Sequence, residues 1–161
     1  MSVPSLSDRL RLKLHLKLHL EELSALTGRS VQADELGSLE QAAQMRMAAQ
    51  KFIAQPFARY EIKFSDRETE RFRKFLQRLT DANPSSVYIW TKHTIDCGAL
   101  LVVSLAEIKF DFDFAINNDG ILVVTTSDLA DKLLLDFSST PEGEQVMTVE
   151  TQGPNWASAV F

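Results

Sequence analysis

The chain has 161 residues, a net charge of −5 and 45% hydrophobic residues, which is the size and composition of one globular domain. Its single cysteine excludes an internal disulfide, and no apolar run approaches the roughly 20 residues of a membrane span or the roughly 7–15 of a secretory signal. We therefore expect one domain over residues 1–161 that is cytoplasmic and does not associate with membranes.

Charge is unevenly distributed along the chain. Residues 1–92 carry a net charge of +4, and residues 93–161 carry −9. This split predicts a negative field over the carboxyl-terminal half, which would repel nucleic acid and attract basic partners. The alternative is that the acidity serves only solubility.

Residues 7–27 contain leucines that alternate with Arg, Lys and His. Strict alternation is typical of a strand, but Leu, Lys, Arg and Glu favour helices and β-branched residues are scarce. Ser7 or Asp8 could cap a helix that ends at Gly28, so we interpret the segment as a helix. Such a helix carries leucines on two opposite faces, and both need cover, as in a buried helix or a dimer contact.

Two further helices and one strand are expected before residue 83. Ser38 and Gln41 resemble a capping box within residues 34–54, and Pro56 ends that helical pattern. Residues 58–64 alternate as a strand does. Residues 66–82 have acids near the start, bases after them and an apolar stripe, which indicates an amphipathic helix.

After Pro84 the pattern changes to short strands with short connections. Asn117–Gly120 and Pro141–Gly143 predict tight turns. Short connections favour an antiparallel meander, so we expect an α+β fold in which helices of residues 1–82 pack on one face of a mostly antiparallel sheet formed by residues 83–161. The predicted strands are residues 86–92, 98–103, 109–116, 120–126, 131–137 and 145–151.

The segment Phe110–Phe114 alternates Phe with Asp. On a strand the phenylalanines would point inward, while Asp111 and Asp113 would share the outer face. Two carboxylates are too few for a hard cation, so we expect either plain solvation or a surface for basic groups rather than a metal site. The predicted partner-binding residues are these two aspartates together with Asp96, Asp119, Asp128 and Trp156.

His93, Asp96 and Cys97 lie close together in the sequence and suggest a thiol hydrolase as a less favoured alternative. A short loop with a buried cysteine explains the same residues. His15 and His19 lack the glutamate of a His-Glu-x-x-His motif, and one cysteine completes no familiar zinc ligand set. We therefore expect no catalytic residues, no metal and no cofactor.

Residues 86–156 resemble immunity proteins of bacterial contact-dependent inhibition and other polymorphic toxin systems. The segments that carry this resemblance are Tyr88–Trp90, Asp96–Gly98, Phe110–Phe114, Gly120–Leu122, Asp128–Phe137 and Gly153–Trp156.

The resemblance implies a bacterial, cytoplasmic protein that is not an enzyme and that neutralises a cognate toxin by stoichiometric binding. Many such toxins are basic nucleases, so an acidic surface would compete with nucleic acid for them. The alternative is a secretion chaperone or adaptor, and the leucine-rich residues 10–20 would then suit a homodimer seam.

Overall fold

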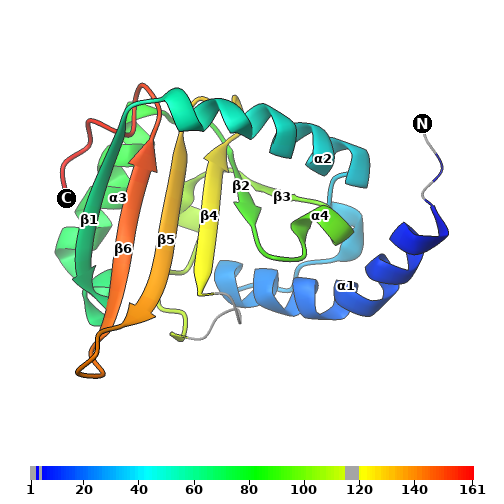
Figure 1. Ribbon diagram of the computed structural model, residues 1–161, viewed down its shortest axis with the longest axis horizontal. Helices are drawn as coiled ribbons and strands as arrows, with labels where there is room; N and C mark the ends of the chain where they lie inside the picture. Colours follow the sequence, from blue (N-terminus) through cyan, green and yellow to red (C-terminus); the bar gives the residue numbers. More distant parts are fainter. Residues whose placement is uncertain (1–2, 4, 115–119) are drawn as a thin grey trace.

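The computed structural model describes residue 3, residues 5–114 and residues 120–161. One antiparallel sheet of six strands organises the chain, in the order β1-β6-β5-β4-β2-β3 (Figure 1). Together with the helices around it, this sheet confirms the predicted α+β class. The strands are β1 (Phe57–Lys63), β2 (Val87–Trp90), β3 (Leu100–Val102), β4 (Ile121–Thr126), β5 (Lys132–Ser139) and β6 (Gln145–Gln152).

Consecutive hairpins form the centre of the sheet. β4 pairs with β5 and β5 pairs with β6, as a meander predicts, and the turn at Gly143 has the positive φ of +84° that favours glycine. The other predicted turn, at Asn117–Gly120, lies largely outside the described residues. Two pairings join strands that are not consecutive in the sequence: β1 pairs with β6, and β2 pairs with β4 in addition to its neighbour β3.

The predicted helix over residues 7–27 is confirmed. Its N-cap is Ser5, two residues before the expected Ser7, because Ser5 and Asp8 form the capping box, and it ends at Gly28 with φ +65°. Among the described residues, no helix combines the length and the apolar character required to cross a membrane. The helices are α1 (Leu6–Thr27), α2 (Leu39–Ala48), α3 (Glu70–Ala82) and α4 (Thr94–Cys97).

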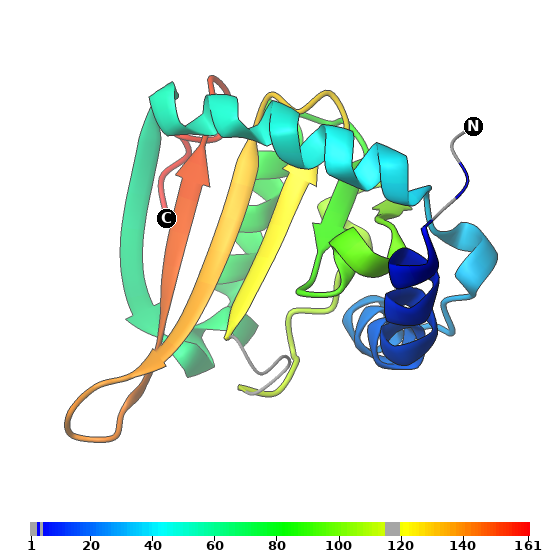
Figure 2. The same cartoon turned by 45° about the vertical axis from the view of Figure 1, so that its right-hand side comes forward.

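The main core lies between α3 and one face of the sheet. Phe72, Phe75 and Leu79 of α3 are fully buried against apolar side chains of the strands. The carboxyl-terminal half of α1 contributes Leu23 and Leu26 to the same cluster. Figure 1 looks onto the opposite face, and Figures 1 and 2 show α2 crossing one end of the sheet and α1 lying to its side.

The predicted strand over residues 109–116 is wrong for the residues described. Phe110 and Phe112 are buried and Asp111 and Asp113 are exposed, so the predicted division between two faces holds. The backbone, however, joins no strand in this segment. The side chain of Arg67 donates hydrogen bonds of 3.0 and 2.7 Å to the Phe112 carbonyl, where a sheet would supply a neighbouring strand.

The two edge strands of the sheet differ in length and in cover. β3 has three residues, and Leu36 forms an isolated bridge with Leu100 beside it. β1 has seven residues, and its Arg59 donates to Glu150 of β6 at 2.6 and 2.9 Å. Charged side chains of β1 therefore stand next to its unpaired edge.

Candidate functional site

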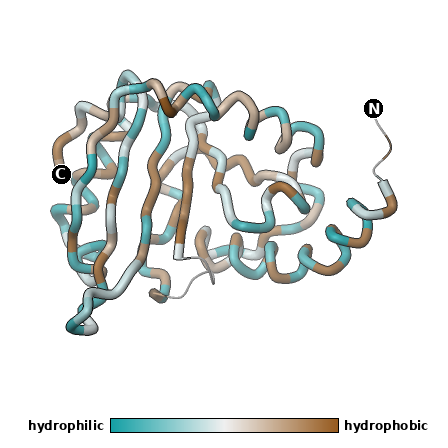
Figure 3. Tube along the Cα trace, in the orientation of Figure 1, coloured by the Kyte–Doolittle hydropathy of each residue, from teal (hydrophilic) through white to brown (hydrophobic). Residues whose placement is uncertain are grey.

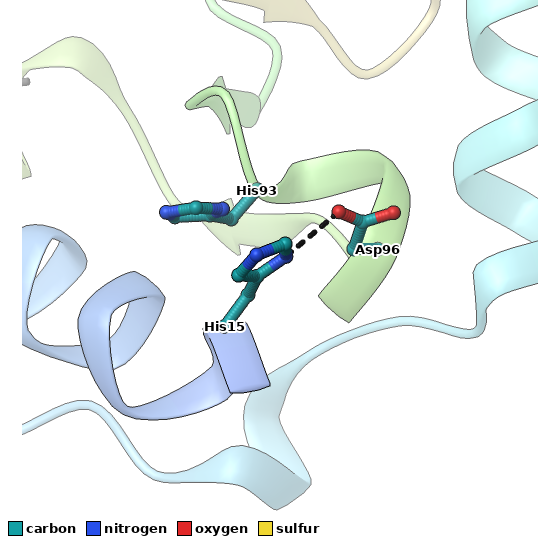
Figure 4. Close-up of side chains that lie close together, drawn as sticks. All are labelled: His15, His93 and Asp96. Atoms are coloured by element: carbon teal, nitrogen blue, oxygen red, sulfur yellow. Dashed lines mark hydrogen bonds and ion pairs between the residues drawn. The ribbon is translucent and has the colours of Figure 1, made fainter. Parts of the chain in front are cut away.

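Three side chains that can bind protons or metals meet where α1 packs against α4. His15 comes from α1, His93 directly precedes α4, and Asp96 lies within α4 (Figure 4). His15 Nδ1 and Asp96 Oδ2 are 2.9 Å apart, and the two imidazole rings stack with centroids 4.5 Å apart and planes at 29°. His93 is buried, whereas the side chains of His15 and Asp96 remain 35% and 22% exposed, so solvent reaches the cluster.

A second histidine of α1 fixes the helix to the same loop. His19 is fully buried, with Nε2 2.9 Å from the Gly98 carbonyl oxygen and Nδ1 2.9 Å from Thr91 Oγ1. Because a carbonyl can only accept, Nε2 carries the proton and Nδ1 accepts from the Thr91 hydroxyl. Burial lowers the pKa of His19, and the nearby His93 lowers it further against the opposing hydrogen bond to Gly98. A neutral imidazole therefore anchors α1 here.

Glycine is required at position 98 in this loop. Gly98 has φ +101°, and a side chain there would collide with the backbone carbonyl of Gly37. The Gly37 N–H in turn donates to the Ala99 carbonyl at 2.9 Å. The segment before α2 is thus fastened to the loop that presents Asp96.

Cys97 is a poor nucleophile. It is 4% exposed, and burial together with the neighbouring Asp96 raises its pKa to about 11. Asp96 is hydrogen-bonded to His15 of α1, whereas a catalytic triad would need it to orient His93 beside Cys97. These features argue against the thiol hydrolase alternative.

The residues predicted to form an acidic sheet surface do not share one face of the sheet. Asp111 and Asp113 lie on the extended segment outside the sheet, and Asp96 lies in α4. Asp128 lies in the turn between β4 and β5, where it accepts from the Ala130 N–H at 3.0 Å. Asp119 falls outside the described residues.

Basic side chains accompany Asp111. A surface hollow that includes Asp111 is also lined by Arg67, Arg73 and Lys109. Opposite charges within one hollow weaken the local negative field on which the predicted mechanism depends. The excess of acids in the carboxyl-terminal half is therefore not gathered into one acidic patch on the sheet.

Trp156 is a core residue, and its predicted role as a surface contact does not fit its position. Its side chain is fully buried, and its indole N–H donates to the Leu79 carbonyl of α3 at 2.9 Å. The adjacent Asp131 is also fully buried and accepts from the Trp156 backbone N–H at 3.0 Å. Both residues hold the carboxyl-terminal turn against α3.

The most prominent exposed apolar feature of the described residues is a row of leucines on α1, which we call the leucine stripe. Its members are four residues apart and therefore follow one side of the helix. Figure 3 shows the alternation of apolar and polar residues along α1, and Figure 1 shows its amino-terminal turns projecting beyond the sheet. The stripe consists of Leu6, Leu10, Leu14 and Leu18, which are 66%, 54%, 72% and 51% exposed.

The opposite side of α1 borders a hollow of about 710 Å³. Leu12 and Leu16 line it from α1, Leu39 and Ala43 from α2, and Ile95 from α4. The sequence predicted that both leucine faces of this helix need cover. Within the described part of the chain, the inner face is only partly covered and the leucine stripe is open to solvent.

Sequence reasoning missed the contact of His15 with Asp96, and it predicted the leucine faces of α1 without deciding which of them is exposed. His15 and Asp96 are 81 residues apart, so no local spacing announces their contact. The leucine stripe was visible as a pattern, but the sequence does not say which of the two leucine faces packs on the domain.

Comparison of this chain with protein-family models, with characterised proteins and with solved structures gave no match.

Proposed function

We propose that this chain is a non-catalytic, cytosolic binding protein that neutralises a cognate bacterial toxin, and that the leucine stripe of α1 is its main contact surface. The observation that carries the proposal is the exposure of four leucines in one row, at 51–72% each. Contiguous exposed apolar surface of this kind marks interaction sites in globular proteins. The raised pKa of the buried Cys97 thiol supports a binding role over thiol catalysis.

Burial of the stripe supplies a useful part of a binding energy. Complete burial of a leucine is worth roughly 1.5–3 kcal/mol, so covering what remains exposed yields about 1–2 kcal/mol for each of the four. The sum of about 4–8 kcal/mol has to offset the entropy lost on association. The stripe therefore supplies the hot-spot residues of a larger interface. Apolar side chains that line the hollow beside α1 extend this interface.

Charges around the stripe define the chemistry of the partner. At 100° per residue, Lys13 and Lys17 lie on one flank of the leucine stripe and Arg11 lies on the other. Lys17 also contacts Glu21 at 3.9 Å, toward the end of the stripe. A partner with an apolar groove and an acidic rim fits this surface, which differs from the basic partner expected from the overall charge split.

Self-association through the stripe is disfavoured by the same charges. In an antiparallel pair of two α1 helices, the same flank of each helix faces its counterpart. The flank with Lys13 and Lys17 of one copy would then meet the identical flank of the other, and like charges repel. We therefore assign the stripe to a different protein rather than to a second copy.

The test begins with the polypeptide encoded beside this chain in its native genome. Cells that express that polypeptide should grow when the wild-type chain is co-expressed and should stop growing when Leu10→Ser/Leu14→Ser replaces it. The purified pair should form a 1:1 complex by calorimetry, and the double substitution should weaken it by more than about 100-fold, from the roughly 3 kcal/mol of leucine burial lost.

The matched control removes two exposed aliphatic side chains elsewhere. Ile53 and Leu101 are 88% and 46% exposed and lie outside α1, so Ile53→Ser/Leu101→Ser should preserve both growth and affinity. Lys13→Glu/Lys17→Glu should slow association. Full protection by the leucine variant would overturn the proposed surface. Binding without protection would exclude toxin neutralisation and favour the adaptor alternative, and a dimer in sedimentation or binding to anionic vesicles would assign the stripe to another occupant.

A further inference from the structure

We propose that His15, His93 and Asp96 form a binding site for one divalent first-row transition metal ion, with Zn²⁺ the best match. The proposal goes beyond the binding role of α1 and does not depend on it. Each of the three residues offers one ligand atom, and these atoms all lie within 4.8 Å of one another. His15 on α1 and Asp96 within α4 point toward each other, and the ring of His93, which precedes α4, stacks on that of His15 (Figure 4).

The separations are close to those that a bound ion requires. Zinc bonds of about 2.0–2.1 Å in tetrahedral geometry place neighbouring ligand atoms about 3.3–3.4 Å apart. His15 Nδ1 and Asp96 Oδ2 are 2.9 Å apart. The ligand atoms that are farthest apart lie within 4.8 Å, so their separation needs to shorten by about 1.5 Å at most to reach the tetrahedral value. Rotation of an imidazole about its broad χ2 torsion supplies a movement of that size.

The ligand types select the class of metal. Two imidazole nitrogens and one carboxylate oxygen suit Zn²⁺ and its neighbours, whereas Ca²⁺ and Mg²⁺ prefer sets made of oxygen. Three protein ligands leave a coordination position for water or for another molecule. That position would open toward solvent, because the side chains of His15 and Asp96 are partly exposed.

The surrounding contacts hold the loop in place for such a site. The His93 backbone N–H donates to Thr91 Oγ1 at 3.2 Å, and the Thr91 N–H donates to Thr94 Oγ1 at 2.8 Å. Thr91 is also the partner of the buried His19, one turn along α1 from His15. Ligands whose backbone is fixed in this way lose little freedom when an ion binds.

Metal titration of the full, untagged chain after treatment with EDTA tests the proposal. Calorimetry with Zn²⁺ should give one site per chain, and Co²⁺ should develop the visible absorption of a low-symmetry site with nitrogen and oxygen ligands. His15→Ala and Asp96→Asn each remove one ligand and should weaken Zn²⁺ binding by more than about tenfold. Both side chains are partly exposed, so these variants should keep the wild-type circular dichroism spectrum.

Asp113→Asn is the matched control, since it removes an exposed carboxylate outside the cluster and should leave Zn²⁺ affinity unchanged. If the ligand variants were to misfold, extended X-ray absorption of the Co²⁺ form of the wild-type chain should still report two imidazole ligands. Absence of saturable Zn²⁺ and Co²⁺ binding would overturn the proposal, as would binding that His15→Ala leaves intact. Because these measurements need no protein partner, they can fail while the proposed role of the leucine stripe stands.

Discussion

Asp131 joins three separate parts of the chain, and its replacement by alanine is predicted to be the most destabilising change of a single carboxylate among the described residues. Its Oδ1 accepts from the backbone N–H groups of Asn155 and Trp156 at 2.9 and 3.0 Å. Its Oδ2 accepts from the side-chain amides of Asn83 and Asn155 at 2.7 and 2.8 Å. The side chain has no exposed surface.

The expected size of the effect follows from these four hydrogen bonds. Each hydrogen bond contributes about 1 kcal/mol net, and removal of Asp131 also leaves four donors without this acceptor, two on the buried Asn83 and Trp156 and two on the half-buried Asn155. We therefore expect Asp131→Ala to lower the free energy of unfolding by about 4 kcal/mol. For a chain of this size, that corresponds to a fall in Tm of about 8–16 °C.

Asp131→Asn distinguishes the contribution of the hydrogen bonds from that of side-chain packing. It keeps the shape but turns one acceptor oxygen into an amide that faces two donors, so about half of the loss is expected, roughly 2 kcal/mol. Urea unfolding at constant m-value measures both changes. Asp113→Ala removes an exposed carboxylate and should cost less than about 0.5 kcal/mol. A loss below about 1 kcal/mol for Asp131→Ala would refute the reasoning.

Three further predictions concern the α1–α4 contact and the carboxyl-terminal turn. Burial lowers the pKa of His19 below 6.5 in the folded chain. As pH falls, the His19 imidazole is therefore protonated in the unfolded chain before it is protonated in the folded chain. The free energy of unfolding should therefore decline below about pH 6.5 in urea titrations, and His19→Gln should flatten that decline; equal slopes would contradict the buried neutral imidazole. Cys97, with its pKa raised to about 11, should react with iodoacetamide at least about 100-fold more slowly in the folded chain than in urea, and comparable rates would show an accessible thiol. Gly153→Ala should destabilise the chain by about 3 kcal/mol or more by thermal melting, because φ is +112° and a Cβ would collide with the Ala130 carbonyl and with Asp131; an unchanged Tm would mean that the turn relaxes.

Local sequence patterns predicted which segments form helices and strands better than they predicted which of these elements pair in space. Alternation and turn residues located β4, β5 and β6, because hairpins with short turns pair strands that are adjacent in the sequence. The pairing of β1 with β6 joins the first strand to the last, and no local signal encodes it. The helix over 7–27 could be predicted because helix propensity and a glycine stop outweighed the alternation of leucines.

The segment around Phe112 shows why alternation alone does not define a strand. Alternation reports that an extended backbone has one buried side, which is true of Phe110 and Phe112. Whether a second strand satisfies the backbone depends on tertiary structure. Arg67 occupies that role through its guanidinium, so the aspartates of this segment lie outside the sheet.

The edges of the sheet limit how copies of this protein could join. β3 is only three residues long, and Leu36 occupies part of its flank. Along β1, Arg59 and Glu61 are exposed, and an incoming strand would have to accommodate them. Polymerisation by strand addition, the usual hazard of an open sheet, is thereby discouraged on both sides. Binding of a different protein is then left to helical surface such as α1, where side chains rather than backbone groups decide which molecule is accepted.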